Sequence, residues 1–189
     1  MKSIIGINGS PRMNGNTHVL INSVMSGLTD RGCKTELLHS GDMKIGECTG
    51  CHACWKGLDC IQNDDMNDIY QRMKEADGYV FGTPVYWYGP TALMKLFIDR
   101  MVFFNCPENR EHIKNKKAVI VIPFEETNHA TVQPVLDFFD KCCEYLEIKI
   151  TDRIIAPGVT KRGEVSSHKE VIDSAYMSGQ NLAEILKAE

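Results

Sequence analysis

The stretch "KSIIGINGSPRMNGNT" (residues 2–17) decides the fold. Its first seven residues are a short apolar run, typical of a strand buried inside a protein. The Gly, Ser and Asn residues that follow lead into apolar positions at helical spacing, namely Val19, Leu20, Val24 and Leu28. A buried strand, a polar loop and a helix in direct succession begin a βαβ unit, which predicts a parallel sheet wherever the alternation continues.

The same alternation runs through the whole chain. Strands are predicted at 2–8, 34–40, 78–84, 117–124 and 148–158, and helices at 16–32, 64–77, 91–104, 131–147 and 164–189. Five strands joined in this way predict one doubly wound parallel sheet covered on both faces, a three-layer α/β/α arrangement. The 189 residues fit a single domain, in which only a cysteine-rich insertion at 46–63 interrupts the alternation of strands and helices.

Composition and charge exclude several classes of function. Lys and Arg total 21 against 25 Asp and Glu, which gives a net charge of -4, and the basic residues are scattered. This charge distribution argues against nucleic-acid or anionic-membrane binding. The first apolar run is too short for a signal peptide, and no segment approaches the ~18 apolar residues of a membrane span. We therefore expect a cytoplasmic protein.

The loop at 8–17, here called the phosphate loop, leaves a strand and enters a helix. Ligands of open α/β sheets bind beyond the carboxyl ends of the strands, and backbone N–H groups with a helix N-terminus can converge there on a phosphate. The loop is neither a Walker loop, because no lysine precedes Thr17, nor a G-x-G-x-x-G turn. A tight turn capped by Asn16 or Thr17 is the alternative. Arg12 favours the phosphate, since it adds a full positive charge.

A second loop, "TPVYWYGP" (83–90), crowds three aromatic residues between two prolines after the third predicted strand. We call it the aromatic loop. A rigid apolar surface of this kind suits a planar aromatic ligand, although packing at a subunit interface would also explain it. A phosphate loop and an aromatic loop at the same edge of the sheet together predict a site for flavin mononucleotide (FMN).

Two motifs carry a resemblance to a known family. "GSPRMNGNT" resembles the phosphate-loop pattern of NADPH-dependent FMN reductases, and "PVYWYGPTALMKLFIDR" resembles their P-x-Y-x-x-x-x-P-x-x-L-K-x-x-x-DR signature, in the same order along residues 2 to about 124. The resemblance implies a flavodoxin-like fold, bound FMN and a homodimer or homotetramer. It also implies the cofactor-binding residues, which are Ser10, Arg12, Asn16 and Thr17 at the phosphate and Pro84, Val85, Tyr86, Trp87, Tyr88 and Gly89 along the isoalloxazine ring.

Three further expectations concern neighbouring segments. Asp99 and Arg100 end the signature, and we assign them a structural ion pair or cap near the helix end. Part of 101–104, with Trp87 or Tyr88, is expected at a subunit interface, with core burial of Met101 and Phe104 as the competing explanation. Relatives often carry glycines after the fourth strand, where this chain has "PFEETNHA" (123–130), so flavin contacts there stay open.

The insertion contains "ECTGCHACWKGLDC" (47–60), with four of the eight cysteines in the pattern C-x2-C-x2-C-x5-C. A disulfide framework is not expected in a reducing compartment, and structural zinc sites usually pair two separated C-x2-C units. Ferredoxins begin with the same C-x2-C-x2-C run. The segment resembles the compact motif of iron–sulfur flavoproteins, a branch of the FMN reductase superfamily, which implies a [4Fe–4S] cluster on Cys48, Cys51, Cys54 and Cys60.

These features predict an FMN-dependent oxidoreductase of the iron–sulfur flavoprotein type that transfers electrons to a small-molecule or protein redox partner. NAD(P)H or ferredoxin is the expected electron donor, and no catalytic side chain is assigned because the flavin carries the reaction. One alternative is a cluster-free NAD(P)H-dependent reductase of FMN, quinones or nitroaromatics, in which the cysteines merely pack or form a redox-sensitive patch. A flavodoxin-like electron carrier and a zinc-stabilised binding module are the others.

Overall fold

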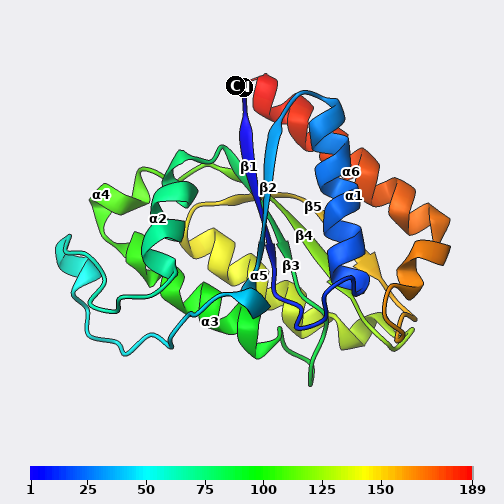
Figure 1. Ribbon diagram of the computed structural model, residues 1–189, viewed down its shortest axis with the longest axis horizontal. Coiled ribbons are helices and arrows are strands. Elements are labelled where there is room, and N and C mark those ends of the chain that lie inside the picture. Colours follow the sequence, from blue (N-terminus) through cyan, green and yellow to red (C-terminus); the bar gives the residue numbers. More distant parts are fainter. Residues whose placement is uncertain (189) are drawn as a thin grey trace.

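Five parallel strands form one sheet in the order β2-β1-β3-β4-β5 in the computed structural model, which describes residues 1–188 (Figure 1). The strands are β1 (Ser3–Asn8), β2 (Lys34–His39), β3 (Gly78–Gly82), β4 (Lys117–Pro123) and β5 (Lys149–Ala156). This order is the flavodoxin-like one, and it confirms the predicted fold class. Its topological switch point lies between β1 and β3, where ligands of such sheets bind.

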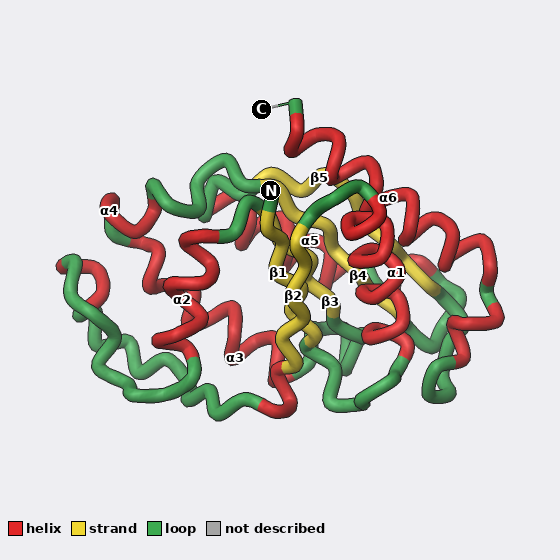
Figure 2. Tube along the Cα trace, turned by 45° about the horizontal axis from the view of Figure 1, so that its top comes forward, coloured by secondary structure: helices red, strands yellow, loops and turns green. Residues whose placement is uncertain are grey.

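Helices cover both faces of the sheet, so the three-layer arrangement is confirmed (Figures 1 and 2). One apolar layer contains α1 (Asn16–Asp30) and α6 (Lys169–Lys187), and the other contains α2 (Met66–Glu75), α3 (Ala92–Arg100) and α5 (Gln133–Tyr145). Residues 118–122 of β4 alternate between the two layers, which is why this stretch is apolar.

Two glycines let α1 and α6 approach each other closely. A Cβ atom on Gly27 would lie 2.1 Å from the Tyr176 carbonyl oxygen, and one on Gly179 would lie 2.0 Å from the Val24 carbonyl oxygen. Neither distance can hold a real side chain, so each glycine is required by the other helix. This packing joins the segment after β1 to the segment after β5.

Several helix boundaries differ from the prediction. The helix expected over 91–104 ends at Arg100 and continues as a 3-10 turn, η3 (Met101–Asn105), and a short helix, α4 (Pro107–Arg110), was not predicted. The helix expected over 64–77 begins only at Met66, because Asp64 and Asp65 bind the backbone N–H groups of residues 46 and 44 instead. The helix expected over 164–189 is split into η5 (Glu164–Ser167) and α6, and residue 189 lies outside the described part.

The apolar segment at 101–104 belongs mainly to the core. Met101, Phe103 and Phe104 are buried within the single chain, and only Val102 is half-buried. Phe103 stacks on Tyr70 with 4.0 Å between the ring centroids and 9° between the planes. Core burial, the competing explanation, therefore accounts for three of these four residues.

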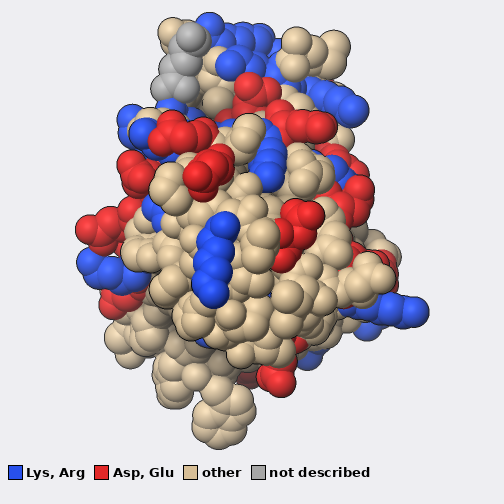
Figure 3. Space-filling view, turned by 90° about the vertical axis from the view of Figure 1, so that its left-hand side faces the viewer, with Lys and Arg blue, Asp and Glu red and all other residues tan. Residues whose placement is uncertain are grey.

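The insertion projects from one side of the fold, where it is cyan in Figure 1. It lies between η1 (Ser40–Asp42) and α2, and its only regular element is the 3-10 turn η2 (Cys54–Lys56). Figure 3 looks onto this side, where charged side chains gather above a largely uncharged lower surface. Within residues 1–188, no helix has the length and apolar character needed to cross a membrane.

Lys116 lies just before β4, against the end of α2. Its Nζ donates to the carbonyl oxygens of Met73 at 3.0 Å and Lys74 at 2.7 Å. Burial lowers the pKa of Lys116 to about 8, and the charge of Asp77 opposes this shift only in part. The folded protein therefore binds this proton less tightly than the unfolded chain, whose lysine pKa is near ~10.4.

This lowered pKa predicts a pH-dependent contribution to stability. Between the two pKa values the unfolded chain binds more protons, so the free energy of unfolding rises with pH. From pH ~7 to pH ~10, the wild type should gain ~1–2 kcal/mol relative to a Lys116→Met variant, which cannot titrate. Urea unfolding at both pH values measures the difference. Lys141→Met, which replaces an exposed lysine, should show the same change in the free energy of unfolding between the two pH values as the wild type. An equal change in both variants would refute the assignment of this pH dependence to Lys116.

Candidate functional site

A cavity lies at the carboxyl ends of β1, β3, β4 and β5, and we call it the switch-point cavity. It brings together seven of the ten predicted FMN-binding residues with 123–125, part of the loop whose flavin contacts were left open, and with 159–160, which was not predicted. Its lining residues are Ser10, Arg12, Asn16, Thr17, Pro84, Val85, Tyr86, Pro123, Phe124, Glu125, Val159 and Thr160. The signal for the missed segment was available, since 159–160 also follows the carboxyl end of a strand.

The phosphate loop is curled by its own hydrogen bonds. The Ser10 backbone N–H donates to Asn8 Oδ1 at 3.0 Å, and the Arg12 N–H donates to Ser10 Oγ at 3.1 Å. Helix α1 then begins after Gly15, and no side chain caps it in the described part of the chain. The first N–H groups of a helix have no partner within the helix, so this end of α1 can accept an anion.

Three polar side chains of the loop are used differently. Asn16 donates to the Val159 carbonyl oxygen at 3.4 Å and accepts from the Val165 N–H at 3.1 Å, so it fastens the segment after β5. Arg12 is exposed, and its Nη1 donates to the Thr160 carbonyl oxygen at 3.1 Å. Thr17 is fully buried, and within residues 1–188 its Oγ1 has no hydrogen-bond partner. An unpaired buried hydroxyl beside an uncapped helix end fits a bound phosphate.

The aromatic loop forms a tight turn. Tyr86 and Gly89 exchange backbone hydrogen bonds of 2.9 and 3.0 Å, and the two residues between them, Trp87 and Tyr88, have φ of 47° and 60°. This left-handed conformation is unusual for aromatic residues. The base of the loop is held where Thr91 Oγ1 donates to the Gly9 carbonyl oxygen at 2.5 Å, which connects it to the phosphate loop.

The tip of this turn lies outside the switch-point cavity. Trp87 is 96% exposed, and with Tyr88 it lines an adjoining pocket that shares Val85, Tyr86 and Glu125 with the cavity. Gly89 lines neither space. Pro84, Val85 and Tyr86 are therefore the aromatic-loop residues placed beside the phosphate-loop residues.

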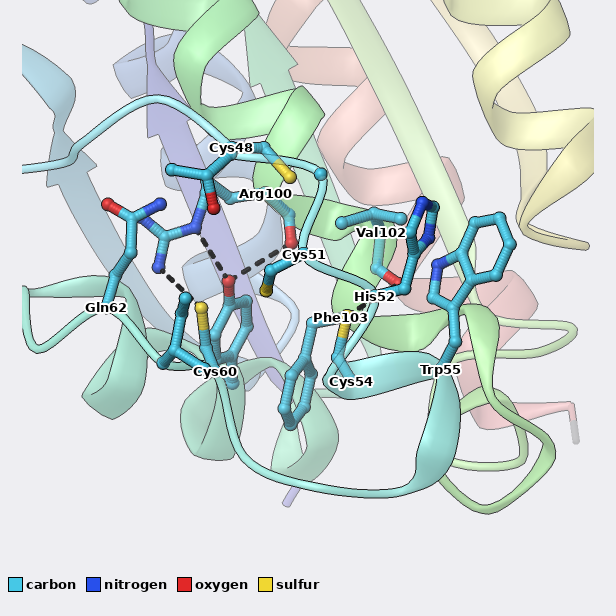
Figure 4. A pocket seen from close by; sticks show the side chains of 14 residues that line it. Cys48, Cys51, His52, Cys54, Trp55, Cys60, Gln62, Arg100, Val102 and Phe103 are labelled. Carbon is cyan, nitrogen blue, oxygen red and sulfur yellow. Dashed lines mark hydrogen bonds between the residues drawn. The ribbon is translucent and has the colours of Figure 1, made fainter.

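The four cysteines of the insertion line a second space, the cysteine pocket (Figure 4). Cys48 and Cys51 are exposed, Cys60 is half-buried and Cys54 is buried, with its thiol donating to the Val102 carbonyl oxygen at 3.8 Å. Gly50 and Gly57 have positive φ, which turns the chain around the pocket. His52 is exposed and packs edge-on against Trp55, 4.2 Å between ring centroids.

The donor set of this pocket fits a cluster. Within residues 1–188, no three His, Cys, Asp or Glu side chains are grouped closely enough to share one metal ion. A [4Fe–4S] cluster makes no such demand, because each thiolate binds a different iron atom and the four ligands surround the cluster. Burial raises the pKa of the Cys54 thiol, and the other three cysteines raise it further.

Arg100 reaches this pocket from the end of α3. Asp99 and Arg100 do form ion pairs, as expected, but not with each other: Asp99 pairs with Lys95, whereas Arg100 pairs with Asp64 at 2.5 Å. Burial opposes ionisation of Asp64, yet hydrogen bonds from Arg100 and the Gly46 N–H hold the pKa of its carboxyl below the usual value. Sequence reasoning missed this contact, although the "DDM" start and the "DR" end of two segments contain both residues.

Comparisons with known proteins agree with this geometry. The profile of the family described as NADPH-dependent FMN reductase matches residues 2–140. An iron–sulfur flavoprotein of Methanocaldococcus jannaschii is 39% identical over 97 residues, which cover 51% of this chain and 50% of the relative. The chain thus spans about half the length of the iron–sulfur flavoproteins it matches.

Two other matches extend over almost the whole chain. A putative NAD(P)H-dependent FMN-containing oxidoreductase of Bacillus subtilis, YwqN, is 22% identical over 173 residues, covering 89% of this chain and 92% of the relative. The structure of a flavone reductase superposes with a TM-score of 0.75 at 20% identity, covering 98% of this chain and 63% of that one. At 20% identity, this superposition shows similarity of fold alone. Since the family profile spans most of the chain and both of its motifs line the switch-point cavity, the protein belongs to the NADPH-dependent FMN reductase family, a family of flavin-dependent oxidoreductases.

Proposed function

We propose that this protein is an FMN-dependent oxidoreductase of the iron–sulfur flavoprotein type. FMN occupies the switch-point cavity, and Cys48, Cys51, Cys54 and Cys60 hold a [4Fe–4S] cluster. The observation that carries the proposal is that all four cysteines of the insertion line a single pocket in a chain of the FMN reductase family. The names of the iron–sulfur relatives, which match over about half of their length, support it.

The side chains of the switch-point cavity have distinct tasks in this proposal. Ser10, Thr17 and the free N–H groups of α1 bind the phosphate, while Arg12 adds a positive charge at its exposed side. Asn16 acts indirectly, because its amide is already used to fix the wall at 159–165. Pro84, Val85 and Tyr86 lie against the ring, and the turn at Trp87, Tyr88 and Gly89 shapes its outer edge.

The protein groups position the cofactors rather than react. When bound, FMN exchanges electrons with a two-electron partner and the cluster passes single electrons. NAD(P)H or ferredoxin supplies the electrons in this proposal, and a small molecule or a protein receives them. A homodimer or homotetramer in the cytoplasm remains part of the proposal.

A cluster-free NAD(P)H-dependent reductase of FMN, quinones or nitroaromatics is the second candidate. The observation that favours it is the match to YwqN, which extends over 89% of the chain, whereas the iron–sulfur relatives match over about half. In that case the four cysteines form a small loop core without iron.

Anaerobic purification followed by cofactor analysis separates the two candidates. We expect about one FMN, about four iron and about four sulfide per chain, with a broad absorbance shoulder near ~400 nm beside the two flavin bands. Full FMN occupancy with iron near zero, even after anaerobic reconstitution with iron and sulfide, would refute the cluster and leave the second candidate.

A further inference from the structure

The guanidinium of Arg100 is completely enclosed. The side chain is 1% exposed, and each of its five N–H bonds has an acceptor. Nε donates to Tyr70 Oη at 3.2 Å, Nη1 to the Gly46 carbonyl oxygen at 3.0 Å and to Asp64 Oδ2 at 2.5 Å, and Nη2 to Asp64 Oδ1 at 3.1 Å. The fifth N–H, also on Nη2, points at Cys60 Sγ, 3.3 Å away.

The surroundings fix the direction of this fifth bond. Arg100 donates one hydrogen bond to each carboxylate oxygen of Asp64, which holds the guanidinium plane at two points. Tyr70 accepts from Nε and donates to the Arg100 carbonyl oxygen at 3.1 Å, and its ring is stacked on Phe103. The Nη2–Sγ contact is therefore built by the fold rather than left to a flexible side chain (Figure 4).

Structural needs alone do not explain this arrangement. A buried guanidinium requires a counter-charge, which Asp64 already supplies. A free thiol is only a weak acceptor, so directing a charged donor at Cys60 gains little in a protein without iron. A thiolate bound to iron carries negative charge and accepts such a bond strongly.

We propose that Arg100 is a positioning residue for the cluster, which holds the sulfur of Cys60 and raises the reduction potential of the cluster. The inference rests on the proposed [4Fe–4S] centre. Hydrogen bonds to cluster sulfurs and nearby charge set the potential of such centres. One-electron reduction adds negative charge to the cluster and its ligands, so a cationic donor stabilises the reduced state more than the oxidised state.

The test is a redox titration of the intact, anaerobically purified protein, monitored by electron paramagnetic resonance of the reduced cluster. Arg100→Lys keeps the positive charge but loses the planar guanidinium. A lysine cannot keep both the hydrogen bond to Cys60 and the paired hydrogen bonds to Asp64. We expect the ratio of reduced to oxidised cluster at a fixed potential to fall roughly tenfold, equivalent to a downward shift of ~59 mV for one electron.

A second variant tests the same idea with the opposite sign. Asp64→Asn preserves the shape of the partner but removes its charge, so the guanidinium faces Cys60 without a counter-charge. The potential should then move upward, again by roughly tenfold in the ratio of reduced to oxidised cluster. This prediction stands on its own if Arg100→Lys does not fold.

Arg110→Lys is the matched control. Arg110 is another largely enclosed guanidinium near a helix end, and its side chain contacts Phe104, Asn105, Tyr145 and Glu147, none of them in the cysteine pocket. It should change stability without changing the potential.

The outcomes separate the inference from the proposed function. Wild-type protein without iron would refute the cluster itself. Wild-type protein with iron, combined with an unchanged potential in both Arg100→Lys and Asp64→Asn, would overturn the role of Arg100 and leave the cluster intact. Shifts of opposite sign in the two variants, with none in Arg110→Lys, would establish it.

Discussion

Replacing Cys54 by serine should lower the iron and sulfide content of the anaerobically purified protein from about four per chain to nearly zero, while FMN stays bound. Cys54 is the most buried of the four cysteines that line the pocket, so no other side chain can move in to replace its thiolate. FMN should remain because no cysteine lines the switch-point cavity.

Cys33→Ser is the matched control for this experiment. Cys33 is also buried, so serine costs stability in both variants, but it packs in the layer of α1 and α6, away from the cysteine pocket. It should keep both cofactors. Iron and sulfide assays, flavin absorbance and circular dichroism are compared across the two variants. Full iron in folded Cys54→Ser would exclude this thiol as a ligand.

Loss of the unpaired hydroxyl in the phosphate loop should act in opposite directions on stability and on binding. In Thr17→Val the buried hydroxyl is gone, so the FMN-free protein should become more stable by ~1 kcal/mol. The same change removes a donor to the phosphate and should weaken FMN binding by roughly tenfold.

Arg12→Ala removes a charge-assisted contact worth ~1.5–3 kcal/mol and should weaken FMN binding by roughly 10- to 100-fold.

Urea unfolding of FMN-free protein and titration of FMN fluorescence measure the two quantities separately. Thr151→Val is the control, because this half-buried hydroxyl on β5 donates to the Ala118 carbonyl oxygen at 3.2 Å and lines no part of the switch-point cavity. That variant should lose stability and bind FMN normally. Unchanged FMN affinity in both Thr17→Val and Arg12→Ala would show that the phosphate binds elsewhere.

The sheet could be predicted because the local sequence of each strand is enough to identify it. Apart from Thr83 and Lys117, the runs at 78–84 and 117–124 are apolar, since both faces of a central parallel strand are covered, and a glycine-containing or polar break follows each. The switch-point cavity followed from the same reasoning, because the carboxyl ends of adjacent parallel strands must meet at one edge. The spacing of the cysteines likewise placed them around a single pocket.

What could not be predicted depends on contacts between distant segments. Asp64 and Arg100 are 36 positions apart, and nothing in the local pattern shows that the end of α3 turns toward the insertion. The change from α3 to η3 has the same origin, because the packing of Phe103 on Tyr70 favours the tighter turn over a continued helix. The unpaired state of Thr17 is a property of its three-dimensional surroundings alone.

The close packing of α1 on α6 has a consequence for synthesis of the protein. The two helices are joined by contacts such as Tyr176 to Asp30, 146 positions apart, and contacts at such separations slow folding because a long loop must close first. A nascent chain still held at the ribosome beyond Ala156 lacks both α6 and the wall formed by Val159 and Thr160. The switch-point cavity is thus completed only after Val159 and Thr160 have emerged, whereas all residues that line the cysteine pocket lie between 48 and 103 and emerge earlier.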